Sequence, residues 1–265
     1  MVNSIHLFTR LRILYLPGSP LQLSLRVQVR RLGAPSRYEP VLHHPDANND
    51  LLIFPRFIFD YYKYVSSVGM IRVNIEKLLS SDVETPIESK IILWPVNLWE
   101  FLGCEDPRAF RAYGSYYMFY TSKGYFLEGR EYIRMDVLGL AEYDDKWRLK
   151  RRGYFTITHG EEKFTPKSNK DGAFIKTQSS KFTLLTRPEI KDNRICWRGL
   201  ADIKAMEIEA ESLEPVLVFE DWELKVGWSR PAAEGLTKGH GYVFGNPFGL
   251  IAGPGPLGHR SYQRQ

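Results

Sequence analysis

The sequence has only two cysteines, Cys104 and Cys196, in 265 residues. Two cysteines do not make a disulfide framework, so we expect a reducing compartment, the cytoplasm, as the protein's location. No apolar run approaches the length needed to span a bilayer. The apolar run at 13–16 is followed by Pro17-Gly18 and is too short for the core of a signal peptide. The sequence therefore predicts no membrane association.

Residue patterns that hold metals or phosphates are also lacking. The six histidines are scattered, and the one adjacent pair, His43-His44, does not have the spacing of metal ligands. No glycine-rich phosphate loop precedes a helix. We therefore expect neither a metal nor a cofactor.

An excess of basic over acidic residues is nearly absent from most of the chain, although the net charge is +5 and the pI is about 9.0. Residues 225–265 carry five Lys or Arg and one Glu, and so hold most of this excess. The main body has no basic stripe, which argues against a nucleic-acid partner. The hydrophobic content of 43% and charged content of 25% are ordinary for a soluble globular protein.

Strand signals dominate what is present. Residues 21–30 alternate strictly between apolar and polar side chains, a period of two. Other segments are rich in β-branched and aromatic residues, and we see no amphipathic helix longer than about three turns. The predicted class is all-β, with further strands at 115–122, 137–143, 173–177, 181–186, 202–210 and 216–220.

A rough internal repeat runs through the chain. Similar stretches open near Asp50, Asp106 and Asp171, each with an apolar strand followed by further strands. Repeats of about 40–50 residues or more, each with four antiparallel strands, are typical of propeller blades. The alternative is a β-sandwich.

The stretch "FLGCEDPRAF", residues 101–110, places charged residues among apolar ones. Buried charges are costly unless they are paired or used. In a propeller, Asp106 and Asp171 would converge from different blades on one axial cavity. Glu105 would point the opposite way on an extended strand and would pair with Arg108 or another cation.

"GCEDPRAF" followed by "YYMFYTS" resembles glycoside hydrolase family 130, five-bladed propellers that cleave or phosphorolyse β-mannosides. "LLIFPRFIFDYYKYVSSVG", "NKDGAFI", "LLTRPEI" and "WELKVGWSRP" resemble further motifs of this family. The resemblance covers about residues 30–231.

The resemblance implies that Asp106 is the general acid that protonates the glycosidic oxygen. Inversion needs a second carboxylate to activate water, and Glu189 and Glu223 stand where family hydrolases carry such glutamates. No metal ligand is implied. The residues assigned to substrate or phosphate are Arg56, Ser66, Glu105, Arg108, Lys170, Asp171 and Arg187.

Hydrolysis and phosphorolysis both remain open. Thr186 stands where family phosphorylases often have His, which favours hydrolysis, and inorganic phosphate would be a co-substrate of a phosphorylase. The third hypothesis is a propeller that binds carbohydrate without catalysis. The expected partner is an oligosaccharide, and a homo-oligomer is left open.

The resemblance also sets the expected domain limits. We predict an unmatched extension at 1–20, the propeller at 21–231, and an irregular Gly/Pro-rich basic tail at 232–265. Too few residues follow the third repeat for two more, so the expected fold is a five-bladed type that lacks its last blade or blades.

Overall fold

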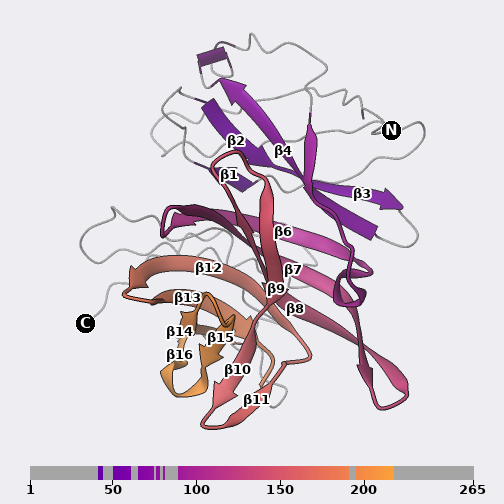
Figure 1. Ribbon diagram of the computed structural model, residues 1–265, viewed down its shortest axis with the longest axis vertical. Coiled ribbons are helices and arrows are strands. Elements are labelled where there is room, and N and C mark those ends of the chain that lie inside the picture. The colour runs from indigo at the N-terminus through magenta and orange to yellow at the C-terminus, as the bar shows by residue number, and fades with distance from the viewer. Residues whose placement is uncertain are drawn as a thin grey trace, which may run out of the picture.

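The computed structural model describes residues 50–60, 65–74, 89–190 and 195–217, together with 41–43, 76–77 and 80. Almost all of these residues lie in strands or tight turns. The strands form three units that follow one another along the long axis of the molecule (Figure 1). No helix in this described part is long and apolar enough to cross a membrane.

The first unit is built on one long strand that pairs on both sides. Residues 71–74 of this strand pair with 50–53, and residues 65–68 pair with 56–60. The partner is divided into two strands because Pro55 interrupts the ladder between them. A fourth strand pairs with the middle of the long strand, and a short one extends the edge. The strands are β1 (Val41–His43), β2 (Asp50–Phe54), β3 (Arg56–Asp60), β4 (Val65–Asn74) and β5 (Lys90–Leu93).

The second unit is a four-stranded antiparallel meander. Its first hairpin turns at Tyr113-Gly114, both with positive φ, which gives the turn a twist compatible with the flanking strands. A short 3-10 helix, η1 (Leu98–Glu100), leads into the unit. The strands are β6 (Gly103–Ala112), β7 (Ser115–Glu128), β8 (Glu131–Tyr143) and β9 (Leu149–Tyr154).

The third unit is a second sheet, in which three consecutive strands form a meander. Two short strands, 207–209 and 214–217, pair with the last strand of this meander. The hairpin of 156–159 and 162–164 joins the sheet through a parallel pairing of 156–158 with 207–209. The strands are β10 (Thr156–His159), β11 (Glu162–Phe164), β12 (Asn169–Gln178), β13 (Lys181–Pro188), β14 (Cys196–Asp202), β15 (Glu207–Glu209) and β16 (Glu214–Leu217), with a 3-10 turn η2 (Ala210–Ser212).

Two apolar cores hold the units together. One core joins the first unit to the second, with Phe54 and Val68 packed against Met118 and Tyr143. The other joins the second unit to the third, where the rings of Phe110 and Phe174 stack 4.6 Å apart at 7°. The first two units are also joined into one sheet by the parallel pairing of Ser66 with Gly103, and the third unit is a separate sheet. Units that follow one another in this way resemble neighbouring propeller blades.

The prediction of an all-β chain is confirmed, but the strand predicted at 202–210 is wrong. The chain turns at residues 203–206, between β14 and β15, and Met206 has a φ of 57°. The Asp202 side chain accepts hydrogen bonds from the backbone N–H groups of Lys204 and Ala205, and so fixes the turn. The predicted strand at 21–30, the domain limits near 20 and 231 and the missing blades lie outside the described residues.

Candidate functional site

Two aspartates occupy the same unusual position in successive units. Asp106 on β6 has a φ of 50°, and Asp171 on β12 has a φ of 56°. In both strands the register shifts at this point, between Glu105 and Arg108 in β6 and between Lys170 and Ala173 in β12. Left-handed backbone in a residue other than glycine is uncommon, and bulges of this kind often redirect a side chain at a functional site.

The bulge in β6 overturns the expected alternation of Glu105 and Asp106. The guanidinium of Arg56 contacts both carboxylates, Glu105 at 2.5 Å and Asp106 at 3.5 Å. Both side chains therefore reach the same group, because the left-handed residue breaks the pleat that would have pointed them apart.

The carboxylate of Glu105 is buried and fully engaged. Besides Arg56 it is bound by Lys123, whose Nζ lies 3.1 Å from Oε2, and by the hydroxyl of Ser66 at 3.4 Å. Burial raises the pKa of Glu105, and the positive charges of Arg56 and Lys123 oppose that shift. The expectation that Glu105 pairs with a cation is confirmed.

Asp106 differs from its neighbour in exposure. The side chain of Asp106 is 29% exposed, against 5% for Glu105. One carboxylate is thus held inside the protein by three groups, while the next reaches solvent beside Arg56. A bound molecule at this place would meet Asp106 rather than Glu105.

Asp171 lies between two arginines. Arg187 on β13 contacts its Oδ2 at 2.7 Å, and Arg108 on β6 contacts its Oδ1 at 3.4 Å. All three side chains are largely buried, so these charges are weakly screened. Arg108 comes two residues after Asp106, and it therefore links the Asp106 group to the Asp171 group.

A repeated Pro-Arg pair explains this geometry. Arg56 follows Pro55 in the first unit, and Arg108 follows Pro107 in the second. Each arginine is the residue at which pairing with the next strand resumes, Arg56 opposite Val68 and Arg108 opposite Phe119. Each also reaches across to the bulged aspartate of the following unit.

The structural repeat therefore differs from the one expected from the sequence. Asp50 is not the counterpart of Asp106, because it pairs with Arg72 at the outer part of the first unit. In the third unit Ala173 takes the position of the repeated arginine, opposite Leu185. The Arg-to-Asp linkage thus runs through two consecutive boundaries between units.

The remaining predicted residues have different placements. Lys170 pairs with Asp136 on β8. Glu189 follows β13, and its backbone N–H donates to the carbonyl of Ser168 at 2.7 Å. Glu223 lies outside the described residues.

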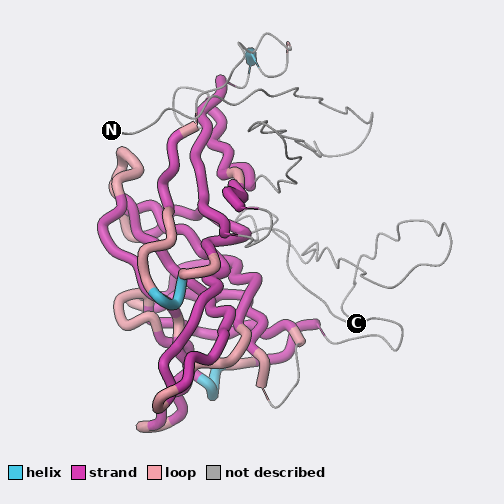
Figure 2. Tube along the Cα trace, turned by 90° about the vertical axis from the view of Figure 1, so that its right-hand side faces the viewer, coloured by secondary structure: helices cyan, strands magenta, loops and turns pink. Residues whose placement is uncertain are grey.

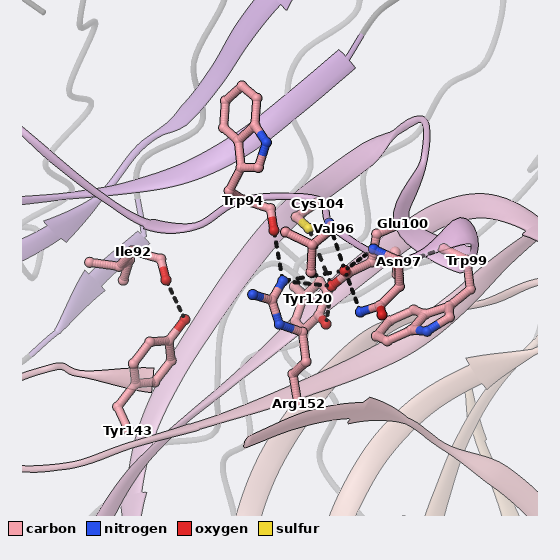
Figure 3. Close-up of polar contacts among 11 residues, drawn as sticks. Ile92, Trp94, Val96, Asn97, Trp99, Glu100, Cys104, Tyr120, Tyr143 and Arg152 are labelled. Atoms are coloured by element: carbon pink, nitrogen blue, oxygen red, sulfur yellow. Dashed lines mark hydrogen bonds and ion pairs between the residues drawn. The ribbon is translucent and has the colours of Figure 1, made fainter. Parts of the chain in front are cut away.

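A second polar cluster supports the segment that leads into β6 (Figure 3). Glu100, fully buried in η1, is contacted through its carboxylate by Arg152 at 3.2 Å and by the hydroxyl of Tyr120 at 2.9 Å. The backbone N–H of Asn97 and the thiol of Cys104 also point to this carboxylate. Burial and the nearby Glu100 carboxylate raise the pKa of the Cys104 thiol, which is therefore an inert core group.

Sequence reasoning missed Lys123, Asp136, Glu100 and Arg152. Lys123 and Asp136 lie opposite each other on β7 and β8, so a correct hairpin register would have placed them near the site together. For Glu100 and Arg152 no local signal exists, because their contact depends on how a loop packs against a strand 52 residues later.

Among the described residues, no cluster of His, Cys, Asp or Glu could hold a metal ion. The fold and the site together define an all-β protein of propeller type with carboxylates and arginines gathered where successive units meet. A partly exposed carboxylate such as Asp106 beside a guanidinium group is suited to binding and protonating a sugar.

The chain belongs to glycoside hydrolase family 130, a family of mannoside-active hydrolases and phosphorylases. The family model, described as beta-1,4-mannooligosaccharide phosphorylase, matches residues 5–243. This match begins before residue 21 and ends after residue 231, the limits expected from the sequence. Enzymes of this family use no cofactor, and phosphate is a co-substrate of the phosphorylases.

Several solved structures are similar to this chain. The β-1,2-mannobiose phosphorylase of Listeria innocua, solved with β-1,2-mannobiose, matches with a TM-score of 0.50 and 15% identity, over 77% of this chain and 69% of its own. A glycosyl hydrolase from Bacteroides ovatus matches with a TM-score of 0.44 and 14% identity, over 74% of this chain and 56% of its own. A family 130 structure described with hydrolases that target β-1,2-mannosidic linkages in Candida mannan gives the same values. A search among curated proteins found no match.

The family model confirms the family resemblance, and the match to the Listeria innocua structure supports the propeller type of the fold. The structures of this family are five-bladed propellers. The described residues hold three successive blade-like units.

Proposed function

We propose that the protein cleaves β-mannosidic linkages with inversion of configuration and that Asp106 is the general acid. The observation that carries this proposal is the contrast between neighbouring carboxylates. Glu105 is enclosed by Arg56, Lys123 and Ser66, whereas the left-handed bulge presents Asp106 to solvent at the boundary between two units. A proton donor must reach the glycosidic oxygen, and of these two carboxyl groups Asp106 is the accessible one.

The second carboxylate is assigned to Glu189 or Glu223. In inverting enzymes the two carboxyl groups stand about 6.5–9.5 Å apart, so that water fits between the base and the sugar. Glu189 follows β13 two residues after Arg187, the arginine that holds Asp171. This position on the strand of the Asp171 group supports Glu189, while the assignment of Glu223 rests on the sequence motif alone.

The arginines hold the substrate in this account. Guanidinium groups bind polar sugar edges and phosphate through paired N–H donors. Arg56 and Arg108 also join successive units through their carboxylate partners, while Arg187 holds Asp171 within the third unit. The same pairs thus fix the geometry of the candidate site and place hydrogen-bond donors in it.

Phosphorolysis is the second candidate, and it differs in the attacking group. A phosphorylase needs additional positive charge for phosphate in place of a carboxylate that activates water. Thr186, which replaces the histidine often found in family phosphorylases, is buried and donates its hydroxyl to Asn169 Oδ1 at 2.6 Å. A neutral, buried threonine adds no charge for phosphate, which favours hydrolysis. A carbohydrate-binding propeller without catalysis is the third candidate.

The products formed with and without phosphate test these candidates. Purified protein is incubated with β-1,2-, β-1,3- and β-1,4-linked mannobiose, and the products are separated by anion-exchange chromatography. We expect mannose to be released equally with and without phosphate. Mannose 1-phosphate formed only with phosphate would establish phosphorolysis instead, and binding of mannobiose without any product would establish the binding module.

A further inference from the structure

The hairpin of β7 and β8 extends beyond its neighbouring strands (Figure 1). Pairing with β6 reaches Lys123, and pairing with β9 reaches Gly139, whereas β7 and β8 stay paired with each other to Glu128 and Glu131. In the ladders of the described residues, 124–135 therefore pair only within this hairpin. Figure 2 shows that the described part of the chain consists almost entirely of strands joined by short loops.

The two faces of this extension differ. One face packs on the protein: Phe126 makes an edge-on contact with Tyr154, and a side chain at Gly124 would collide with the backbone of Trp99. On the opposite face Leu127 is 62% and Tyr132 65% exposed, and Tyr125 is half-buried.

The exposed face combines aromatic rings with a cation. The ring of Phe101, itself 62% exposed, lies 6.0 Å from the ring of Tyr125. The cross-strand pairs Tyr125–Arg134 and Leu127–Tyr132 follow one another along the hairpin. We call this surface the hairpin shelf; it consists of Phe101, Tyr125, Leu127, Tyr132 and Arg134.

The hairpin shelf is continuous with the candidate site. The next pair inward on the same face is Lys123–Asp136. Lys123 binds Glu105, and Asp136 binds Lys170, so both members of this pair contact predicted site residues. Arg134 in turn lies 3.6 Å from Asp136.

We propose that the hairpin shelf binds sugar units of a β-mannooligosaccharide beyond those at the cleaved bond. This inference rests on the proposed mannoside cleavage and adds a longer glycan as the preferred substrate. A pyranose has an apolar C–H face that packs on aromatic rings and a hydroxyl edge that accepts hydrogen bonds from a guanidinium. From Lys123 to Leu127 the strand rises about 13 Å, long enough for more than one sugar unit.

The glycan is favoured over a second copy of the chain as the occupant. The shelf alternates rings with the cation Arg134 and leads without interruption to groups that contact Glu105 and Lys170. A glycan whose end is bound at the candidate site would lie along the hairpin shelf. An interface between two copies of the chain would not require the shelf to lead to the candidate site.

The test compares Tyr132→Ala with the control Phe164→Ala, which removes another exposed ring, on β11 in the other sheet. Both side chains are exposed, so both variants are expected to fold. The first readout is the ratio of kcat/KM for mannotetraose to kcat/KM for mannobiose, with β-1,2- and β-1,4-linked substrates. The second readout is calorimetric binding of the same mannotetraoses to proteins that also carry Asp106→Asn.

We expect Tyr132→Ala to lower the kcat/KM ratio, and the affinity for mannotetraose, about tenfold, the loss of one ring contact, with no change in Phe164→Ala. If the unaltered protein cleaves nothing but Tyr132→Ala still weakens mannotetraose binding, the shelf stands and the proposed cleavage fails. An unchanged ratio and affinity in Tyr132→Ala, or no binding of either mannotetraose by the unaltered protein, would overturn the shelf. A change in sedimentation of Tyr132→Ala with unchanged glycan binding would assign the surface to contacts between copies instead.

Discussion

Replacing Asp106 with asparagine is expected to lower kcat on mannobiose by about 10²–10⁴-fold, the usual contribution of a general acid. Asparagine keeps the size of the side chain and tolerates the left-handed backbone that this position requires, so the bulge in β6 should persist. The loss should appear in kcat, because the proton is transferred only as the bond breaks. Steady-state kinetics with each mannobiose isomer measures it.

Asp50→Asn is the matched control for this change. Asp50 is also a strand aspartate with an arginine partner, Arg72, but it lies away from the Asp106 and Asp171 groups. We expect its turnover to equal that of the unaltered protein. Undiminished turnover in Asp106→Asn would remove Asp106 from the role of proton donor.

Removing Arg152 is expected to cost the fold about 3 kcal/mol. The Arg152→Ala change leaves the Glu100 carboxylate fully buried without its cation (Figure 3), and breaking a buried ion pair typically costs 3–5 kcal/mol. The lower end applies because Arg152 remains 17% exposed. Arg152 also donates to the carbonyl of Trp94 at 2.7 Å, so its loss frees the segment that precedes β6. Urea unfolding followed by circular dichroism gives the change in free energy.

Two further variants separate the buried pair from ion pairing in general. Arg198→Ala breaks an exposed pair with Glu214 and should cost less than about 1 kcal/mol. Adding Glu100→Gln to Arg152→Ala should recover part of the loss, because the uncompensated charge is then gone. Equal destabilisation by Arg152→Ala and Arg198→Ala would show that the Glu100 cluster contributes no more than a surface pair.

Composition and alternation were enough to predict the class and the order of the units. Strands such as 115–122 and 181–186 were found because residues that favour a half-buried pleated surface recur there. Asp106 and Asp171 were selected from the sequence because their carboxylates stand beside apolar runs, and their convergence on one axial cavity stays a prediction. Both kinds of signal depend only on neighbouring residues in the chain, so they can be recognised without the structure.

The details that failed depend on backbone that leaves the regular pattern. Glu105 and Asp106 were expected to point to opposite faces of the strand, but the bulge breaks this alternation. A pattern of alternating apolar and polar residues does not indicate where a bulge begins. The strand predicted at 202–210 failed for a similar reason. The Asp202 side chain stabilises a turn at 203–206, inside a segment whose residue pattern predicts a strand. The partners of Asp171 come from two different units, and only the packed sheets show which arginines reach it.

Proton donation by Asp106 to the departing sugar is the central step of the proposed reaction. A substrate whose leaving group needs no proton tests this step directly. With 2,4-dinitrophenyl β-mannoside the leaving group departs as a stable anion. We predict that Asp106→Asn retains nearly the kcat/KM of the unaltered protein on this substrate while losing turnover of mannobiose. An equal loss on both substrates would contradict the assignment of Asp106 as the general acid.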